Sequence, residues 1–331
     1  MSFPSGKVLV IGATGKVGQA VVKHLKSHGI PVRAFVRNLS SVTTADIAGT
    51  AAPATDFFSD TTGRAPLVVN DSQVEVCQGD VTDPEAVSRA IEGVVAVIDV
   101  HGVAPLRFTR LSDIWSDPLA DSSHPASVNF KGVLNIVSAC QAHGVDRLVR
   151  LTGMSVAMKA SSPLVWVFCL LLSWTVKWHR RAEILIRESG LNYTVVQPSG
   201  LKDFAAAHER GDMLLLECEA ASPLPALPPA TGISRADVAS LCVEVLGYGG
   251  CNKATVRCVS LPQFKQVPPA SKAASEWSQL IPSVKPDTQA LTDQSYVTYS
   301  LVGLTLIGTV LCALCYGIAK LVWIISSAAL R

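Results

Sequence analysis

The sequence predicts an α/β fold, a doubly wound parallel sheet with helices on both faces, followed by a C-terminal transmembrane helix. Short apolar runs typical of buried parallel strands alternate with segments of helical periodicity up to about residue 261. A glycine-rich turn separates the first of these strands from the first helix. A long uncharged apolar segment lies near the C-terminus.

The first strand, helix and second strand form a compact β-α-β unit. Residues 8–11 are a continuous apolar run, and apolar residues then recur at helical spacing until Gly29 and Pro31 end the helix. Residues 32–36 form the second strand. Further strands are expected at residues 74–77, 94–100, 147–151, 193–197 and 254–260.

Helix start signals support this alternation. Thr82 or Asp83 is expected to cap a helix that has Pro84 in its first turn, and Ser234 pairs with Asp237 in a capping-box arrangement.

Three parts of the chain follow from this pattern: a dinucleotide-binding domain at residues 1–262, a tether rich in proline and serine at 263–295, and a membrane helix at 296–325. Two inserts in the first part, residues 39–73 and 103–127, are rich in small and polar residues and are expected to be surface loops.

Residues 301–319 contain no charge, and the uncharged sequence extends back to Gln294. That length suffices to cross a bilayer core of about 30 Å, so we expect one span; a buried core helix is the alternative. The expected interfacial anchors are Tyr296, Tyr299, Lys320, Trp323 and Arg331. This arrangement resembles a tail anchor, with the folded domain in the cytosol and the helix in contact with membrane lipid. The sequence does not distinguish the endoplasmic reticulum from the mitochondrial outer membrane.

Composition excludes some function classes. The net charge of +2, without basic runs interleaved with aromatic residues, predicts no nucleic-acid partner. Nine cysteines follow no framework spacing, which indicates reduced thiols. His24 and His28 have the spacing of helical metal ligands but no third ligand nearby, so no metal site is expected.

The glycine-rich turn is the strongest functional signal. Gly12, Gly15 and Gly18 follow a strand and open a helix, where glycine allows a tight turn and a close approach of backbone amides to a pyrophosphate. A purely structural glycine turn is the alternative. The residues expected to contact a dinucleotide here are Gly12, Thr14, Gly15, Lys16, Val17 and Gly18.

Residues after the second and third strands indicate which dinucleotide binds. Where an NAD binder has an acidic residue, this chain has Arg37 followed by Asn38, and a guanidinium suits a 2′-phosphate. We therefore expect NADP(H) in preference to NAD(H), although a solvent-exposed arginine at a strand end is the alternative. Asp80, followed by Val81, is placed to accept a hydrogen bond from the adenine amino group, unless it only begins the next helix.

Several motifs resemble one family. The chain contains, in order, "VLVIGATGKVG", "AFVRN", "GDVTDPEAV", "NFKGVLNIVSAC", "VDRLVRLTG", "RAEILIRESGLNYTVVQPSGL" and "ISRADVASLCVEVL". This order is similar to that of atypical short-chain dehydrogenase/reductase proteins with the Rossmann fold, in particular the NmrA-like and biliverdin/flavin reductase-like branch. The resemblance covers roughly residues 5 to 261 and implies NADP(H) binding, without specifying a reaction.

The resemblance also implies where a catalytic pair would lie. Many relatives carry a Tyr and, four residues later, a Lys on the helix before "RAE"; here these places hold Thr175 and His179. A threonine hydroxyl is too weak an acid to replace a phenol, whereas imidazole titrates near neutrality, so His179 is the candidate proton donor. Loss of the pair is the alternative. Thr152 or Ser155, after the fifth strand, is a further candidate for contact with a carbonyl or with nicotinamide.

The helix that carries these positions raises two more expectations. Its basic residues are expected to form a solvated face: Lys177, Arg180, Arg181 and Arg187. Just upstream, residues 163–174 are strongly apolar, and form either a core helix or an apolar lip of the cofactor cleft that suits a quinone-like substrate.

Two function classes therefore remain. The first is a membrane-tethered NADPH-dependent oxidoreductase that acts on a small hydrophobic carbonyl, quinone or flavin-like acceptor. The second is a non-catalytic NADP(H)-binding sensor or scaffold at a membrane, which loss of the Tyr and Lys favours. A structural subunit that binds no nucleotide is disfavoured by the intact glycine turn.

Overall fold

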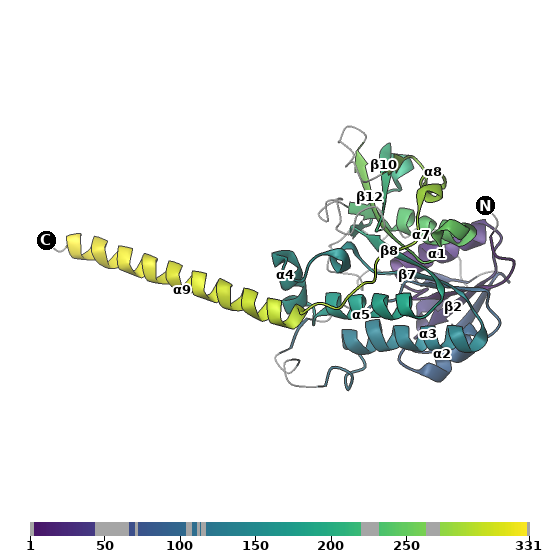
Figure 1. Ribbon diagram of the computed structural model, residues 1–331, viewed down its shortest axis with the longest axis horizontal. Helices are drawn as coiled ribbons and strands as arrows, with labels where there is room; N and C mark the ends of the chain where they lie inside the picture. The colour runs from purple at the N-terminus through teal and green to yellow at the C-terminus, as the bar shows by residue number, and fades with distance from the viewer. Residues whose placement is uncertain are drawn as a thin grey trace.

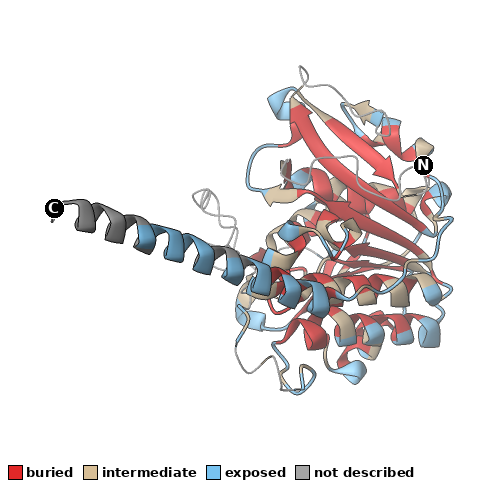
Figure 2. Cartoon of the chain, turned by 60° about the vertical axis from the view of Figure 1, so that its left-hand side comes forward, coloured by how far each residue is buried: buried red, intermediate tan, exposed pale blue. Residues whose placement is uncertain are grey.

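A nine-stranded sheet forms the centre of the molecule and is covered by helices on both faces (Figures 1 and 2). The computed structural model describes residues 3–43, 66–69, 72–103, 108–110, 113, 117–219, 232–262 and 272–329. One face of the sheet buries its apolar side chains against α1 (Lys16–Ser27), α7 (Arg235–Glu244) and α8 (Trp277–Leu280). The other face packs against α2 (Pro84–Ile91), α3 (Gly132–His143) and α5 (Thr175–Glu188).

The sheet has the order β13-β10-β12-β8-β7-β6-β1-β2-β5. Its strands are β1 (Val8–Ile11), β2 (Val32–Val36), β5 (Val74–Gln78), β6 (Ala96–Asp99), β7 (Arg147–Leu151), β8 (Asn192–Pro198), β10 (Asp212–Cys218), β12 (Ala254–Pro262) and β13 (Lys272–Ala274). All neighbours from β5 to β12 pair in parallel, and β10 pairs antiparallel with both β12 and β13. The Rossmann-like α/β fold predicted from the sequence is confirmed.

Smaller elements surround this core. The remaining helices are α4 (Pro163–Leu171), α6 (Ala207–Arg210) and α9 (Tyr296–Ala329). Two short parallel pairs join β3 (Val42–Thr43) with β4 (Leu67–Val68), and β9 (Gly200–Lys202) with β11 (Gly232–Ser234). Single turns of helix are η1 (Leu39–Ser41), η4 (Met154–Ala157), η5 (Val245–Gly247), η6 (Gly249–Cys251) and η7 (Ile281–Ser283); η3 (Ala126–Lys131) is a π-helix. Most of the insert at 39–73 and several residues of 103–127 lie outside the described residues.

The predicted helix starts have a clear local cause. Asp83 caps α2, where its Oδ1 accepts hydrogen bonds from the backbone N–H groups of Glu85 at 3.0 Å and Ala86 at 3.3 Å. Ser234 caps α7 by accepting from the Asp237 N–H at 3.0 Å. Each cap satisfies backbone donors that have no partner within the helix.

The C-terminal region differs from the predicted tether. Within residues 263–295 the chain forms β13 and α8, and Trp277 of α8 is 1% exposed in the main apolar core. The Trp277 indole N–H donates to the Asp237 backbone carbonyl at 2.7 Å. Part of this segment therefore belongs to the folded domain: β13 joins the sheet and α8 packs in the core.

The prediction of a transmembrane helix is wrong. In the part of the chain that the structure describes, no helix combines the length and the apolar character that crossing a membrane requires. This finding overturns the tail anchor, the membrane tether and the single-pass localisation with a cytosolic domain.

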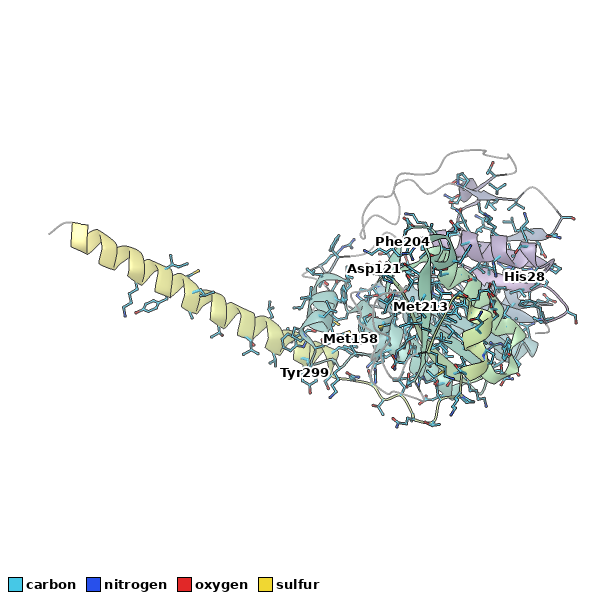
Figure 3. All side chains as sticks on the ribbon, turned by 90° about the horizontal axis from the view of Figure 1, so that it is seen from above. His28, Asp121, Met158, Phe204, Met213 and Tyr299 are labelled. Carbon is cyan, nitrogen blue, oxygen red and sulfur yellow. The ribbon has the colours of Figure 1, made fainter. Side chains whose placement is uncertain are left out.

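The start of α9 packs against the domain, which the sequence pattern did not predict. Tyr296, expected as an interfacial anchor, is 1% exposed and packs with Trp174 and Trp178, while Gly303 lies directly against the Trp166 ring. The first turns of the segment therefore belong to the domain surface. Further along, α9 extends away from the domain (Figure 1), and Tyr299 is labelled near the point where it leaves (Figure 3). Of the other expected anchors, Lys320 is exposed on α9, whereas the Trp323 side chain and Arg331 lie outside the described part of the chain.

The sequence predicted that the basic residues of α5 form one solvated face, and the structure shows that they do not. Arg180 is 6% exposed and donates to the backbone carbonyls of Val156 at 2.9 Å and Thr292 at 2.7 Å. Arg187 forms a two-pronged ion pair with Glu219, at 2.9 and 2.7 Å. A long basic side chain can be buried when carbonyls or a carboxylate accept hydrogen bonds from its guanidinium group.

The apolar segment 163–174 is in part the predicted core helix, and none of its residues is among those that line the groove described below. Val165 and Cys169 of α4 are buried, whereas Leu164, Val167 and Leu171 are between 40% and 49% exposed. One side of α4 therefore belongs to the core and the other side is open.

Candidate cofactor groove and active site

A groove lies at the carboxyl ends of the parallel strands, where ligands of doubly wound sheets bind. Nine of the residues predicted to contact a dinucleotide line it: Gly12, Thr14, Gly15, Lys16, Val17, Gly18, Arg37, Asp80 and Val81. Asn38 does not; its side chain accepts from the Ser40 N–H at 3.0 Å and caps η1. Of the predicted catalytic residues, Thr152 and His179 line the groove and Thr175 does not.

The glycine turn has no room for side chains at two of its three glycines. Gly12 has a φ of +85°, and a Cβ there would lie 2.9 Å from the backbone of His101. A Cβ on Gly18 would lie 2.1 Å from the Gly12 carbonyl oxygen. The turn therefore holds the N-terminus of α1 close to the end of β1, where its unpaired N–H groups favour a phosphate.

Arg37 and Asp80 lie at the end of the groove where an adenosine would bind. The Asp80 Oδ1 accepts hydrogen bonds from the Thr82 N–H at 2.9 Å and the Thr82 hydroxyl at 2.8 Å. These bonds fix the Asp80 carboxylate at the groove wall. The cap of α2 is Asp83, so Asp80 is not the residue that begins that helix.

Two cations of the groove share one carboxylate. Asp203, which follows β9, accepts from Lys16 Nζ at 2.6 Å and from Arg235 Nη1 at 2.5 Å. Burial would raise the pKa of Asp203, but Lys16 and Arg235 lower it overall. The bridge joins the glycine turn to the start of α7 and holds two positive charges beside the expected phosphate position.

The floor of the groove contains a buried charged cluster. His101 follows β6, and its Nδ1 lies 2.5 Å from Asp99 Oδ1 while its Nε2 lies 2.9 Å from the Val128 carbonyl. Arg150 is fully buried and donates to Asp99 Oδ2 at 2.7 Å. Burial would raise the pKa of Asp99, but Arg150 and His101 outweigh this effect and lower it. Both ring nitrogens of His101 have hydrogen-bond partners, so this residue has a structural role in the groove wall.

His179 lies on the same wall and is linked to Thr175 through Asn129. Asn129 of η3 has its Nδ2 at 3.1 Å from the Thr175 hydroxyl and 3.3 Å from His179 Nε2. Burial, followed by repulsion from Arg150 and His101, lowers the pKa of His179 to about 3. Among the described residues, His179 Nδ1 has no hydrogen-bond partner. The ring is therefore neutral at physiological pH, and its Nδ1 is buried.

Thr152 is the second predicted catalytic residue on the wall. It follows β7, and its hydroxyl donates to Glu183 Oε1 at 2.6 Å. Glu183 lies on α5, four residues after His179, and is fully buried. Catalytic use of Thr152, His179 and Thr175 stays a prediction.

Sequence reasoning missed four residues of this site: His101, Glu183, Asp203 and Arg235. His101 directly follows a predicted parallel strand, so its place at the carboxyl edge of the sheet was a usable signal. Asp203 and Arg235 reach the groove only because β9 and β11 pair, and no local pattern predicts that pairing.

Comparison with known proteins identifies relatives of the chain. The sequence model of a family described as NAD(P)H-binding matches residues 12–248. An uncharacterized chloroplastic protein of Arabidopsis thaliana is 30% identical over 202 residues, which is 60% of either chain. Sanguinarine reductase of Eschscholzia californica is 27% identical over 263 residues, covering 72% of this chain and 83% of that protein.

A solved structure shows the same fold. A short-chain dehydrogenase/reductase of Veillonella parvula, in complex with NADP, aligns with a TM-score of 0.52 at 16% identity, over 77% of this chain and 94% of that chain. The chain spans 60%, 65% and 29% of the lengths of three chloroplastic relatives from Arabidopsis thaliana.

Proposed function

The chain belongs to the NAD(P)H-binding family, and from that premise we propose that it is an NADPH-dependent oxidoreductase acting on a small hydrophobic carbonyl, quinone or flavin-like acceptor. One observation carries this proposal. A single groove has the glycine turn and Arg37 at one end, and Thr152 and His179 at the other. A dinucleotide that places its pyrophosphate on the glycine turn would reach both ends.

The nicotinamide end of this groove suits an apolar acceptor. Its walls include Val103, Val128, Leu151 and Leu201 beside the hydroxyl of Thr152 and the ring of His179. Apolar walls with a few fixed polar groups are typical of sites for small organic ligands. A reduced nicotinamide would supply the hydride, and these side chains would orient the acceptor and exclude water. One relative, sanguinarine reductase, is named for a reduction.

Arg37 is the basis for expecting NADPH in preference to NADH. A charge-assisted contact to a phosphate contributes about 1.5 to 3 kcal/mol, which corresponds to roughly ten-fold or more in affinity. In the full chain, Arg37→Ala is expected to weaken NADPH binding by about this factor and to change NADH binding little. Titration by nicotinamide fluorescence measures both constants. Arg89→Ala, on the exposed side of α2 and outside the groove, is the matched control.

Equal losses for NADPH and NADH would contradict the assignment of Arg37 to the 2′-phosphate. A wild-type chain that binds neither dinucleotide would reject the proposed function altogether.

The second candidate is a non-catalytic NADP(H)-binding sensor or scaffold. The observation in its favour is that Thr175 and His179 occupy the places where relatives carry Tyr and Lys, and that Thr175 is turned toward Asn129 and lies outside the groove. Oxidation of NADPH with menadione, flavin mononucleotide and an apolar aldehyde separates the candidates. Turnover supports the enzyme, whereas tight NADPH binding without turnover of any acceptor supports the sensor.

A further inference from the structure

Reduction of a carbonyl or quinone by a hydride leaves a negative oxygen, so the site also needs a proton. General acids that supply one contribute about 10² to 10⁴ in rate. His179 is poorly suited to that task, because its lowered pKa of about 3 leaves the ring neutral near neutral pH. Another group of the groove wall must then hold the proton.

Glu183 has the required position. It is fully buried, and the hydroxyl of Thr152 lies 2.6 Å from its Oε1 and separates it from the groove. The Thr152 hydroxyl donates to Glu183 in this structure, and after rotation toward the groove it can accept from a protonated Glu183 and donate to the acceptor. Thr152 therefore links an enclosed carboxyl to the position where the acceptor oxygen would bind.

The direct partners of Glu183 are neutral. Besides Thr152, the Gln197 side-chain amide donates to both carboxylate oxygens, at 3.1 and 3.0 Å. The Gln197 carbonyl oxygen accepts from Arg257 Nε at 3.3 Å, which fixes the direction of the amide. Arg257 itself is paired with Glu217 at 3.0 Å, so its charge is already balanced.

Two charged groups act on Glu183: Arg187 follows it by one turn on α5, and Glu219 lies just beyond β10. The phenol of Tyr296, at the start of α9, is a neutral neighbour whose pKa Glu183 helps to raise. Burial raises the pKa of Glu183, with a further contribution from Glu219, and this exceeds the opposing effects of Arg187, Thr152 and Gln197. Arg187 is held by Glu219 and by Asp287, which limits its effect on Glu183.

We propose that Glu183 is the proton source of this site and that the hydroxyl of Thr152 transfers the proton to the acceptor. This inference rests on the proposed function. While the acceptor gains the hydride that a bound nicotinamide would supply, the Thr152 O–H bond would break and the acceptor oxygen would gain an O–H bond. The Glu183 O–H bond breaks at the same time and restores the Thr152 hydroxyl. Glu183 is left as a carboxylate, and water regains the groove after product release and returns the proton by the same route.

Thr152→Val and Glu183→Gln in the full chain test this relay with menadione as acceptor. Thr152→Val keeps the volume but removes the hydroxyl, and Glu183→Gln keeps the shape but removes the proton. For both variants we expect kcat to fall about 100-fold, with an unchanged Kd for NADPH. In the wild type kcat should fall as pH rises through the Glu183 pKa, and this pH dependence should be absent from both variants. Thr152→Ser restores a hydroxyl and should recover most of the lost turnover.

Infrared spectroscopy gives a readout that does not depend on turnover. The wild type at neutral pH should show the C=O stretch of a buried protonated carboxyl, and Glu183→Gln should lack it. If Glu183→Gln does not fold, the Thr152→Val and Thr152→Ser pair still tests the relay.

The possible failures are distinct. An ionised Glu183 at neutral pH, or an unchanged kcat and pH profile in Thr152→Val, overturns the relay while the enzyme stands. Wild-type protein that binds NADPH but reduces none of the acceptors overturns the proposed function, and the relay with it.

Discussion

Several ionisable side chains at or next to the groove wall are buried, which is unusual for such groups. Asp99, Arg150 and Glu183 are 1% exposed or less and His179 is half-buried, and the four differ in whether an opposite charge lies in contact. Asp99 and Arg150 neutralise each other at 2.7 Å. His179 and Glu183 have no opposite charge in direct contact, so burial acts on each of them toward the neutral form.

His179 should make the fold sensitive to acid. Its pKa is lowered from 6.5 to about 3 in the folded chain, so below about pH 6.5 the unfolded chain binds a proton that the folded chain does not. Stability from this group is therefore complete above that pH and is lost as pH falls toward 3. Between about pH 7 and about pH 4.5 we expect a loss of roughly 2 to 3 kcal/mol from His179.

Urea unfolding of the wild type and His179→Gln at the two pH values measures this loss. The variant should show the smaller fall in stability on acidification, and His208→Gln, at an exposed position, should behave as the wild type does. Equal falls in wild type and His179→Gln would mean that the histidine is not held neutral.

At the scale of elements, the glycine turn determines how closely α1 approaches β1. Gly18→Ala would place a methyl group 2.1 Å from the Gly12 carbonyl oxygen, and both atoms belong to rigid backbone. We expect a loss of about 1 to 3 kcal/mol in stability, together with much weaker NADPH binding, because the helix N-terminus moves. Gly249→Ala has open space around the new methyl group and is the control.

Thermal unfolding and NADPH titration of the two variants give the comparison. If Gly18→Ala kept wild-type affinity, the close contact would have no part in binding the cofactor.

The elements that the sequence predicted are those with local signals. Apolar runs and caps specify β1, β2, β5, β6, β7, β8 and β12, and their boundaries are correct to within two residues. The run "DMLLLEC" was missed as β10 because leucine favours helices as readily as strands. Trp277 was missed as a core residue because proline-rich sequence surrounds it, and only contact with α7 shows its role.

The same limit applies to the site. The glycine turn and Arg37 were predictable because strand, turn and helix are adjacent in the chain. Glu183 gave no such signal, since its importance depends on Thr152, a residue 31 positions away that donates to it from another element. Tyr296 is an example of the opposite error. Its apolar segment has a strong local pattern and was predicted to be a membrane helix, whereas its first turn packs against the domain.

Across the whole molecule, a bridge between distant parts of the chain joins two cations that line the groove. Asp203 follows β9, and it holds Lys16 of the N-terminal glycine turn and Arg235 at the start of α7. Both cations line the groove beside the expected pyrophosphate. The carboxylate therefore competes with the phosphates of the cofactor for the same two charges.

Asp203→Asn should consequently strengthen NADPH binding. Partly exposed ion pairs contribute about 0.2 to 1 kcal/mol, so the removal of this competitor should tighten Kd by about two- to five-fold at low salt. The gain should shrink as salt rises, because ions screen the attraction of Lys16 and Arg235 for the phosphates. Asp212→Asn, which removes the partner of Arg210 away from the groove, is the matched control. A weaker Kd in Asp203→Asn would mean that the bridge positions the two cations for the phosphates. Asp203 would then be part of the binding site.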